Sequence, residues 1–284
     1  MEEIKHLKSL TSVDAYYEKS FNRGRLGHHF HCNHELILVR NGSAEFIING
    51  AKKIAEANSL VVISDLEEHE LSIKEVPYCR YVLNITAELS LLVISEPILL
   101  SLLMQRPEKF DHVIPLEQEL ADKLTVCFDK AVLECAQKKA FWEMRTAMYT
   151  AEILLELYRG NSSVFPHKRD KLTVQIVLSL QKDIALDYKN KITLEEMAKK
   201  YFISKYYLSR VFKELTGYGF KQYLTLYRLN EAKKLLRNTE LPISDVCSGA
   251  GYQDINHFIR IFRENQDCSP LQYRKKFKLR KEVL

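Results

Sequence analysis

The sequence lacks the features of a membrane or secreted protein. No apolar run approaches the roughly 18–20 residues that cross a bilayer. The first residues, MEEIKHLKSL, contain no apolar segment of a signal peptide. Six cysteines among 284 residues include no C-x-x-C pair, which argues against a disulfide framework and against a zinc knuckle. We therefore expect a cytoplasmic protein with reduced thiols and no membrane partner.

Acidic charge is scarce in the C-terminal part of the chain. Residues 168–284 contain 24 Lys and Arg against 13 Asp and Glu, whereas residues 1–167 contain 18 basic and 24 acidic residues. The two parts therefore carry net charges of +11 and −6. This separation indicates that the C-terminal part contacts a polyanion, with chance segregation of solvated charge as the alternative.

Glycine is also sparse, but two of the nine glycines follow asparagine within residues 28–86. Asn41-Gly42 separates ELILVR from SAEFII, and Asn49-Gly50 separates SAEFII from AKKIA. Asn-Gly between apolar runs is a strong hairpin signal, because both central positions of a type I′ turn need a positive φ. SLVVIS and YCRYVLNI are typical of further strands, with DLEEHE and KEVP as polar breaks. We expect a small antiparallel barrel or sandwich.

After about residue 89 the apolar residues recur at helical spacing. Two amphipathic helices are predicted. Their apolar stripes are Leu116, Leu120, Leu124, Phe128, Val132 and Cys135 in the first, and Phe141, Met144, Met148, Ile153, Leu154 and Leu157 in the second. We favour pairing of these helices with a second subunit, and packing within the same chain is nearly as well supported.

The segment RGNSSVFPHKRD, residues 159–170, is the best linker, because Gly, Asn, Ser and Pro cluster in it. The change of net charge falls at its end. We therefore expect an α+β chain with a β domain over residues 1–88, a helical region over residues 89–160 and an all-α domain over residues 168–284.

Residues 192–217, ITLEEMAKKYFISKYYLSRVFKELTG, predict two short helices joined by a turn. Thr193 and Glu196 have the spacing of a capping box, and Ser204 is a good N-cap for a second helix that ends at Gly217. This is the helix-turn-helix arrangement, although short helical pairs also occur in all-α cores. The exposed face of the second helix would present Lys205, Tyr206, Ser209, Arg210 and Lys213 to the major groove of DNA.

The pattern recurs in LPISDVCSGAGYQDINHFIRIFRENQDCSPLQYRKK. Ser244 is the predicted N-cap of its first helix, and Gly251 makes the turn. The second helix buries Phe258, Ile261 and Phe262 and exposes Asn256, Arg260 and Arg263. Between the two units, YLTLYRLNEAKKLLRNT predicts one amphipathic helix that would space two recognition helices along the DNA.

Residues 192–276 closely resemble the DNA-binding domain of AraC/XylS-type transcription regulators. The resemblance rests on SKYYLSRVFKELTG, FKQYL, RLNEAKKLL, GYQDINHFIRIF and SPLQYR in this order and spacing. It implies recognition helices at residues 204–215 and 254–264. It also implies DNA contacts by Lys205, Tyr206, Ser209 and Arg210 in the first unit and by Gln253, Asn256 and Arg260 in the second. The exposed helix faces add Lys213 and Arg263.

The stretch HHFHCNHEL, residues 28–36, holds four of the nine histidines. The β region around it resembles the cupin-like sensor domain that many such regulators carry. His29, His31, Glu35 and Gly42 match the first cupin motif. The second motif supplies His69, but SDLEEH lacks the Pro and Gly of that motif. His28 and His34 alternate away from this set, so we expect them at the surface.

His29, His31, Glu35 and His69 have three possible roles: lining a ligand pocket, forming a structural polar cluster, or binding a divalent metal. The degraded second motif argues against the metal. We therefore assign the four residues to effector binding and expect neither a metal nor another cofactor.

The sequence thus predicts a DNA-binding transcription regulator and not an enzyme. The expected partners are double-stranded DNA, RNA polymerase, a second copy of the chain, and a small-molecule effector such as a sugar or related metabolite. The resemblance favours activation over repression. The alternatives are a metal-dependent cupin enzyme or metal sensor fused to a DNA-binding domain, and an effector-free regulator whose barrel only dimerises the chain.

Overall fold

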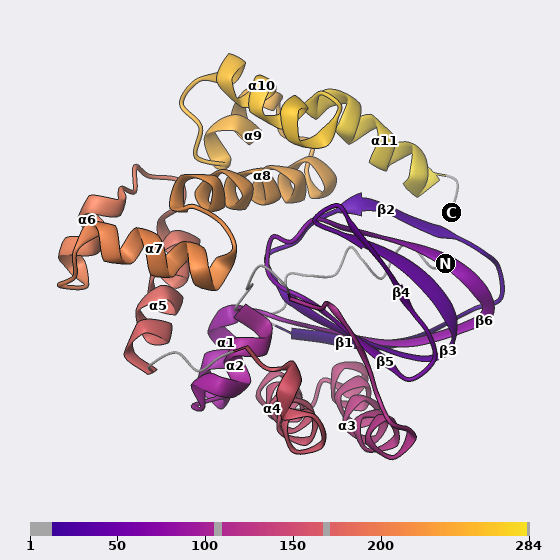
Figure 1. The fold of residues 1–284 in the computed structure, drawn as a ribbon. Helices are drawn as coiled ribbons and strands as arrows, with labels where there is room; N and C mark the ends of the chain where they lie inside the picture. The colour runs from indigo at the N-terminus through magenta and orange to yellow at the C-terminus, as the bar shows by residue number, and fades with distance from the viewer. Residues whose placement is uncertain (1–12, 105–109, 167–170, 283–284) are drawn as a thin grey trace.

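The computed structural model describes residues 13–104, 110–166 and 171–282. Within these ranges a curved β sheet is followed by helices (Figure 1). The strands are β1 (Val13–Ser20), β2 (Arg25–His29), β3 (His34–Ile48), β4 (Ala51–Ala55), β5 (Ser59–Ile63), β6 (His69–Ile85) and β7 (Val113–Pro115). The helices are α1 (Ala87–Val93), α2 (Pro97–Met104), α3 (Gln118–Gln137), α4 (Trp142–Gly160), a 3-10 turn (Ser162–Val164), α5 (Lys171–Asp187), α6 (Leu194–Lys200), α7 (Lys205–Thr216), α8 (Phe220–Asn238), α9 (Ile243–Gly249), α10 (Ile255–Gln266) and α11 (Pro270–Glu282). None of the described helices has both the length and the apolar character needed to cross a membrane.

The sheet is antiparallel throughout, with the strand order β1-β6-β3-β5-β7, and with β2 also paired to β6 and β4 to β3. The long strands β3 and β6 pair with each other along most of their length. The beginning of β6 also pairs with β2, and its end pairs with β1. The sheet therefore curls around apolar side chains such as Phe46, Ile63 and Val82, as the strand pattern predicts.

One of the two predicted Asn-Gly hairpins is wrong. Asn49 and Gly50 have φ values of +48° and +82° and connect β3 to β4, as expected. Asn41-Gly42 instead lies inside β3, where the pairing with β6 shifts register. Gly42 has a φ of +71°, and a Cβ there would lie 2.5 Å from the Glu75 carbonyl oxygen. The segment KEVP, which we expected to separate two strands, likewise lies inside β6. A bulged bend in the paired strands β3 and β6 therefore stands where the sequence predicted a hairpin turn and a polar break.

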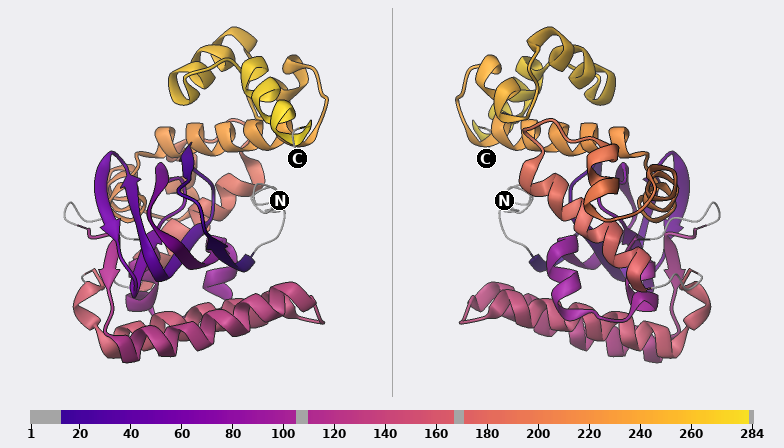
Figure 2. Two further views of the ribbon diagram at one scale, coloured as in Figure 1. Left: turned by 90° about the vertical axis from the view of Figure 1, so that its right-hand side faces the viewer. Right: turned by 90° about the vertical axis from the view of Figure 1, so that its left-hand side faces the viewer.

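Helices α3 and α4 form an antiparallel pair that covers one side of the sheet (Figure 2). The α3 stripe is confirmed at Leu124 and Phe128, which are fully buried in one core with strand residues. In α4 the prediction is only partly right. Ile153, Leu154 and Leu157 are buried, whereas Phe141, Met144 and Met148 are exposed. Thr146, Ala147 and Thr150 complete the buried face instead, because small side chains allow α4 to approach α3 closely.

Helices α6 and α7 begin at the N-caps that the sequence indicates, whereas α9 does not. The Thr193–Glu196 capping box is present, and Ser204 caps α7, which ends at Gly217 with a φ of +77°. Asp254 caps α10 by accepting from the His257 amide. The exception is α9, whose N-cap is Pro242 and not Ser244.

Two sheet-domain residues, Phe30 and Leu66, are buried in the core of the C-terminal helices. They pack in the same apolar cluster as Val177 of α5, Phe212 of α7 and Leu229 of α8. Figure 2 shows α8 lying between the sheet and the helices α9–α11. The sheet domain and the first helix-turn-helix unit are therefore joined through one continuous apolar core.

Candidate nucleic-acid interface and effector pocket

The first candidate interface is the exposed face of α7. Its buried face consists of Leu208, Val211, Phe212 and Leu215, which fixes the rotation of the helix about its axis. The predicted residues Lys205, Tyr206, Ser209, Arg210 and Lys213 all lie on the opposite, exposed face. The Tyr206 side chain is 88% exposed, so its ring is available to a ligand. Lys205 forms an ion pair with Glu195 of α6 at 2.6 Å, which a phosphate would have to replace.

The second candidate interface is the exposed face of α10. Phe258 and Phe262 are fully buried, while Ile261 is only partly buried. The predicted residues Gln253, Asn256, Arg260 and Arg263 are exposed. Arg260 contacts Glu264 of the same helix at 2.9 Å in an exposed pair of little energetic weight. The two units thus offer matching polar faces on helices that the long α8 separates (Figure 1).

The four predicted effector residues converge in the sheet domain. A ring nitrogen from each of His29, His31 and His69 lies within 4.8 Å of the others. Glu35 Oε2 lies 3.3 Å from His31 Nε2 and 3.4 Å from His69 Nε2. His69 and Glu35 are buried, whereas His29 and His31 are partly exposed. The spacing in the sequence therefore indicated a real cluster.

Burial and mutual contact set the charges in this cluster. Burial, reinforced by His69 and His31, lowers the pKa of His29 well below its usual range. Burial and His31 lower the pKa of His69 to about 4. Burial alone would raise the pKa of Glu35, but the hydrogen bond from His31 and the surrounding imidazoles bring it well below its usual range. At neutral pH His29 and His69 are therefore neutral imidazoles beside the carboxylate of Glu35.

A pocket opens between this cluster and α8. His29, His31 and Glu35 line it, whereas His69 is not among its lining residues. Its lining residues are Asp14, Tyr16, His29, Phe30, His31, Cys32, Asn33, Glu35, Asn84, Asn230, Lys233, Lys234 and Arg237. The last four belong to α8, so one wall of the pocket comes from the C-terminal helices. This wall was not predictable from local patterns, because α8 lies about 200 residues further along the chain than the histidines.

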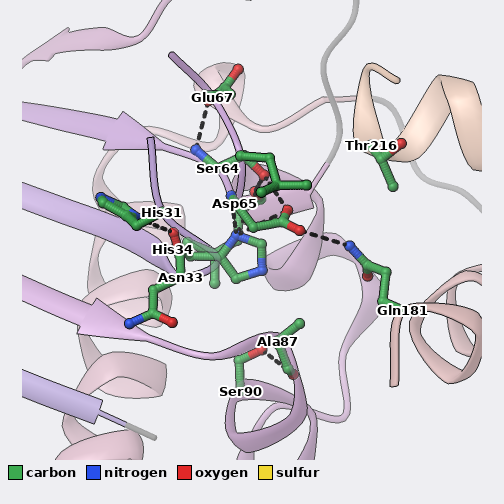
Figure 3. A network of polar contacts seen from close by, with 12 residues as sticks. His31, Asn33, His34, Ser64, Asp65, Glu67, Ala87, Ser90, Gln181 and Thr216 are labelled. Carbon is green, nitrogen blue, oxygen red and sulfur yellow. Dashed lines mark hydrogen bonds and ion pairs between the residues drawn. The ribbon is translucent and has the colours of Figure 1, made fainter. Parts of the chain in front are cut away.

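His34 is not at the surface as expected but fully buried at the other contact between the sheet and the helices. Its Nδ1 accepts a hydrogen bond from the Asp65 amide at 3.3 Å. The Asp65 carboxylate accepts from Gln181 of α5 at 3.1 Å (Figure 3). It also accepts from Tyr223 of α8 at 2.6 Å. These residues were not predictable from the sequence, because no local pattern relates positions more than 100 residues apart.

The chain is similar in sequence to known DNA-binding regulators. A helix-turn-helix domain model matches residues 197–276. YijO of Escherichia coli (strain K12), an uncharacterized HTH-type transcriptional regulator, is 33% identical over 125 residues. The matched region covers 41% of this chain and 44% of YijO. The HTH-type transcriptional activator RhaS of Klebsiella pneumoniae (strain 342) is 26% identical over 263 residues, 87% of this chain and 86% of RhaS.

Similarity of fold extends over both halves. The structure of wild-type ToxT from Vibrio cholerae strain SCE256 with a bound unsaturated fatty acid has a TM-score of 0.56 at 14% identity, covering 92% of this chain and 94% of ToxT. The matched domain shows a helix-turn-helix domain over residues 197–276, and the relatives show that the chain resembles transcription regulators of the AraC/XylS type.

Proposed function

We propose that the chain activates transcription when a small molecule binds in the pocket between the sheet and α8. The observation that carries this proposal is the composition of the pocket wall. His29, His31 and Glu35 line one side, and α8, which links the two helix-turn-helix units, lines the other. A ligand that contacts both sides has different binding free energies for different positions of α8. It therefore shifts the equilibrium between those positions.

Contacts at the edge of the pocket couple the two walls. Lys233 Nζ of α8 lies 3.3 Å from the carbonyl oxygen of Phe30, and Asn230 Nδ2 lies 3.1 Å from Cys32 Sγ. Phe30 and Cys32 flank His31, so displacement of the histidine segment by a ligand acts directly on α8. The position and orientation of α8 then set the relative placement of α7 and α10.

The lining suggests the class of effector. Asn33, Asn84 and Tyr16 offer neutral hydrogen-bonding groups, while Arg237 offers positive charge and Lys233 offers it when protonated. A small polar molecule with hydroxyl groups and an acidic group would satisfy both kinds of group. Sugars and their acidic derivatives are therefore the first compounds to test. Fatty acids form the second class, because the ToxT structure holds an unsaturated fatty acid.

The exposed faces of α7 and α10 are assigned to DNA. Arg210 and Arg260 can each donate two hydrogen bonds to guanine in the major groove, and Asn256 can pair with adenine. Lys205, Lys213 and Arg263 would neutralise phosphates, and Tyr206, Ser209 and Gln253 would add base or backbone contacts. These roles rest on exposure, spacing and family resemblance.

We also propose that the chain acts as a cytoplasmic homodimer that contacts RNA polymerase and catalyses no reaction. Exposed apolar residues recur at helical spacing on both covering helices, at Val126 and Leu133 of α3 and at Met144, Met148 and Leu155 of α4. A second copy of the same pair would bury them. The double substitution Leu133→Glu and Met148→Glu should make the protein monomeric in sedimentation experiments.

The function is tested with full-length protein and DNA fragments from upstream of its own and neighbouring genes. We expect sequence-selective binding whose affinity falls steeply with salt and changes when an effector from the panel is added. Thermal shifts across the same compounds would identify the effector. Salt-dependent binding without any sequence preference would contradict the assignment of α7 and α10.

A further inference from the structure

The turn of the first helix-turn-helix unit exposes an aromatic ring. Phe202 lies between α6 and α7 and is 95% exposed, whereas its neighbours Tyr201 and Ile203 pack against the core of the C-terminal helices. Phe202 also has a φ of +55°. This left-handed conformation costs free energy in any residue with a Cβ and is unusual for a bulky one. The ring therefore contributes no packing to the turn, and the backbone that carries it is strained.

The second helix-turn-helix unit makes the same turn with a glycine. Gly251 has a φ of +83°, and its amide donates to the Ser248 carbonyl at 3.0 Å, as the Phe202 amide donates to the Lys199 carbonyl at 3.2 Å. In both units the following amide donates to the carbonyl five residues back, at 3.0 Å. Glycine adopts a positive φ without steric cost. The turn therefore needs no side chain at this position, and the strained aromatic residue in the first unit points to a role outside the fold.

Phe202 adjoins the face of α7 that we assign to DNA. Lys205 and Tyr206 occupy the first turn of α7, and Tyr206 is 88% exposed, so two exposed aromatic residues lie four positions apart. Lys199, in the last turn of α6, is exposed as well. Figure 1 shows α6 at the left edge of the molecule, away from the sheet. Basic residues thus precede and follow the ring along the chain, which suits a polyanion that also presents apolar groups.

We propose that Phe202 packs against the C5-methyl group of a thymine in the major groove and adds a base preference to the first unit. The thymine methyl is the apolar group that bases present in this groove, and phenylalanine is one of the side chains that can contact it. The inference rests on the proposed function, because it requires α7 to enter the major groove. It also makes the two units unequal, since Gly251 has no ring to offer the DNA.

The substitution Phe202→Gly separates a DNA contact from a role in the fold. It gives the first unit the residue that the second unit has in the same turn. The Tm of the full-length protein should stay the same or rise, because glycine relieves the strained backbone. Affinity for the best duplex selected from randomised DNA should fall by about tenfold, because the ring no longer leaves water on binding. A lower Tm would show that the ring supports the fold and would overturn the proposal.

A change in the DNA identifies the partner of the ring. Each thymidine of the selected duplex is replaced in turn by deoxyuridine, which lacks only the C5-methyl group. For the unmodified chain, one replacement should lower the affinity about fourfold, the effect of roughly one methyl group removed from water. The same replacement should leave the affinity of Phe202→Gly unchanged. Equal effects of every replacement on the two proteins would mean that Phe202 contacts no thymine methyl.

The matched control is Phe141→Gly. Phe141 is 80% exposed, has a φ of +62° and precedes α4 in the helical pair that covers the sheet. The variant therefore removes a similar ring from a similarly strained backbone, outside the helix-turn-helix units. It should keep the full effect of the deoxyuridine replacement. Loss of that effect in Phe141→Gly would contradict a specific role of Phe202.

The remaining outcomes distinguish this inference from the proposed function. Sequence-selective binding that Phe202→Gly leaves unchanged overturns the role of Phe202 and leaves the proposed function in place. Absence of any selective binding by the unmodified chain contradicts the proposed function, and the inference fails with it. If Phe202 instead docks on RNA polymerase or on a second copy, Phe202→Gly would lower transcription in a reconstituted assay or produce monomers while the thymine preference remains, and either result overturns the proposal.

Discussion

Lys233 of α8 and Phe30 of the sheet domain are joined by two contacts of a single ammonium group. Lys233 Nζ lies 3.3 Å from the carbonyl oxygen of Phe30 and 3.3 Å from the centroid of its ring. The Lys233 side chain is buried, and its residue is only 3% exposed. Burial, together with the nearby Arg237, lowers the pKa of Lys233 to about 7. This lysine therefore titrates near neutral pH at the junction of the two halves.

The free energy of unfolding should rise with pH because of Lys233. The pKa is about 7 in the folded chain and near its usual 10.5 in the unfolded chain, so the unfolded state binds more protons between these values. Between pH 6.5 and 9 the contribution is about 2–3 kcal/mol in favour of folding. Urea unfolding at several pH values measures it.

Lys233→Met should flatten this pH dependence, because it keeps an unbranched side chain and removes the titrating group. Lys234→Met is the neighbouring control, since the pKa of Lys234 is raised and not lowered. An unchanged slope in Lys233→Met would show that other groups cause the dependence.

The Asp65–Tyr223 hydrogen bond should couple effector binding to DNA binding. Tyr223→Phe removes the hydroxyl that donates to the buried Asp65 at 2.6 Å. The free energy of unfolding should fall by about 1–3 kcal/mol, because the carboxylate loses one donor. The effector should then shift DNA affinity less than in the unmodified chain, while binding without effector is retained. Fluorescence anisotropy with operator DNA provides both values.

A double-mutant cycle with Asp65→Ala isolates this interaction. We expect a coupling free energy of about 0.5–3 kcal/mol between the two positions. Tyr158→Phe, in the partly exposed part of α4, is the control and should change stability by less than about 0.5 kcal/mol. Additive changes in the free energy of unfolding for Asp65→Ala and Tyr223→Phe would mean that this hydrogen bond does not stabilise the contact between the sheet domain and α8.

Arg210 and Lys213 of α7 should affect DNA binding in different ways. Arg210→Ala should reduce the preference for one base by about 1–3 kcal/mol, because a bidentate contact to guanine is lost. Lys213→Ala should weaken binding to all sequences and reduce the salt dependence by about one counterion. Selection from randomised operators and salt titrations distinguish these results. Lys130→Ala in α3, a helix that lies apart from α7 and α10 (Figure 1), should change neither. Uniform weakening by Arg210→Ala would make Arg210 a phosphate contact.

Gly42→Ala should destabilise the sheet. A Cβ at this position would lie 2.5 Å from the Glu75 carbonyl and 2.8 Å from the Pro77 carbonyl, and the backbone has a positive φ. We expect a loss of about 2 kcal/mol or more in the free energy of unfolding, from the strain of the left-handed conformation and the clash with backbone atoms. Gly24→Ala is the control, because a Cβ there has open space. Equal stability of the two variants would contradict the role of Gly42 in the bend.

Local signals in the sequence were reliable where a structure depends on neighbouring residues. Thr193, Ser204 and Gly217 marked helix boundaries correctly, because capping depends on groups within about four residues. Asn41-Gly42 predicted a turn that is not there, because a positive φ occurs in a bulge as well as in a turn. Which of the two forms depends on the pairing of β3 with β6.

Long-range contacts were not accessible from the sequence. The position of His34 is set by Asp65 and thereby by α5 and α8, so alternation along a strand could not predict its burial. The histidine cluster was predicted because three of its four residues lie within seven positions, whereas its α8 wall was not. The same limit applies to Met144 and Met148, whose exposure follows from how α4 is rotated against α3.

The burial of Phe30 and Leu66 among the C-terminal helices has a practical consequence for engineering. A chimera that joins residues 171–282 to an unrelated sensor would leave two unfilled cavities beneath α7 and α8. Filling them requires the grafted sensor to bring apolar side chains of similar size to the same two places. Successful exchange of sensors should therefore depend on these two contacts more than on the length of the connecting segment.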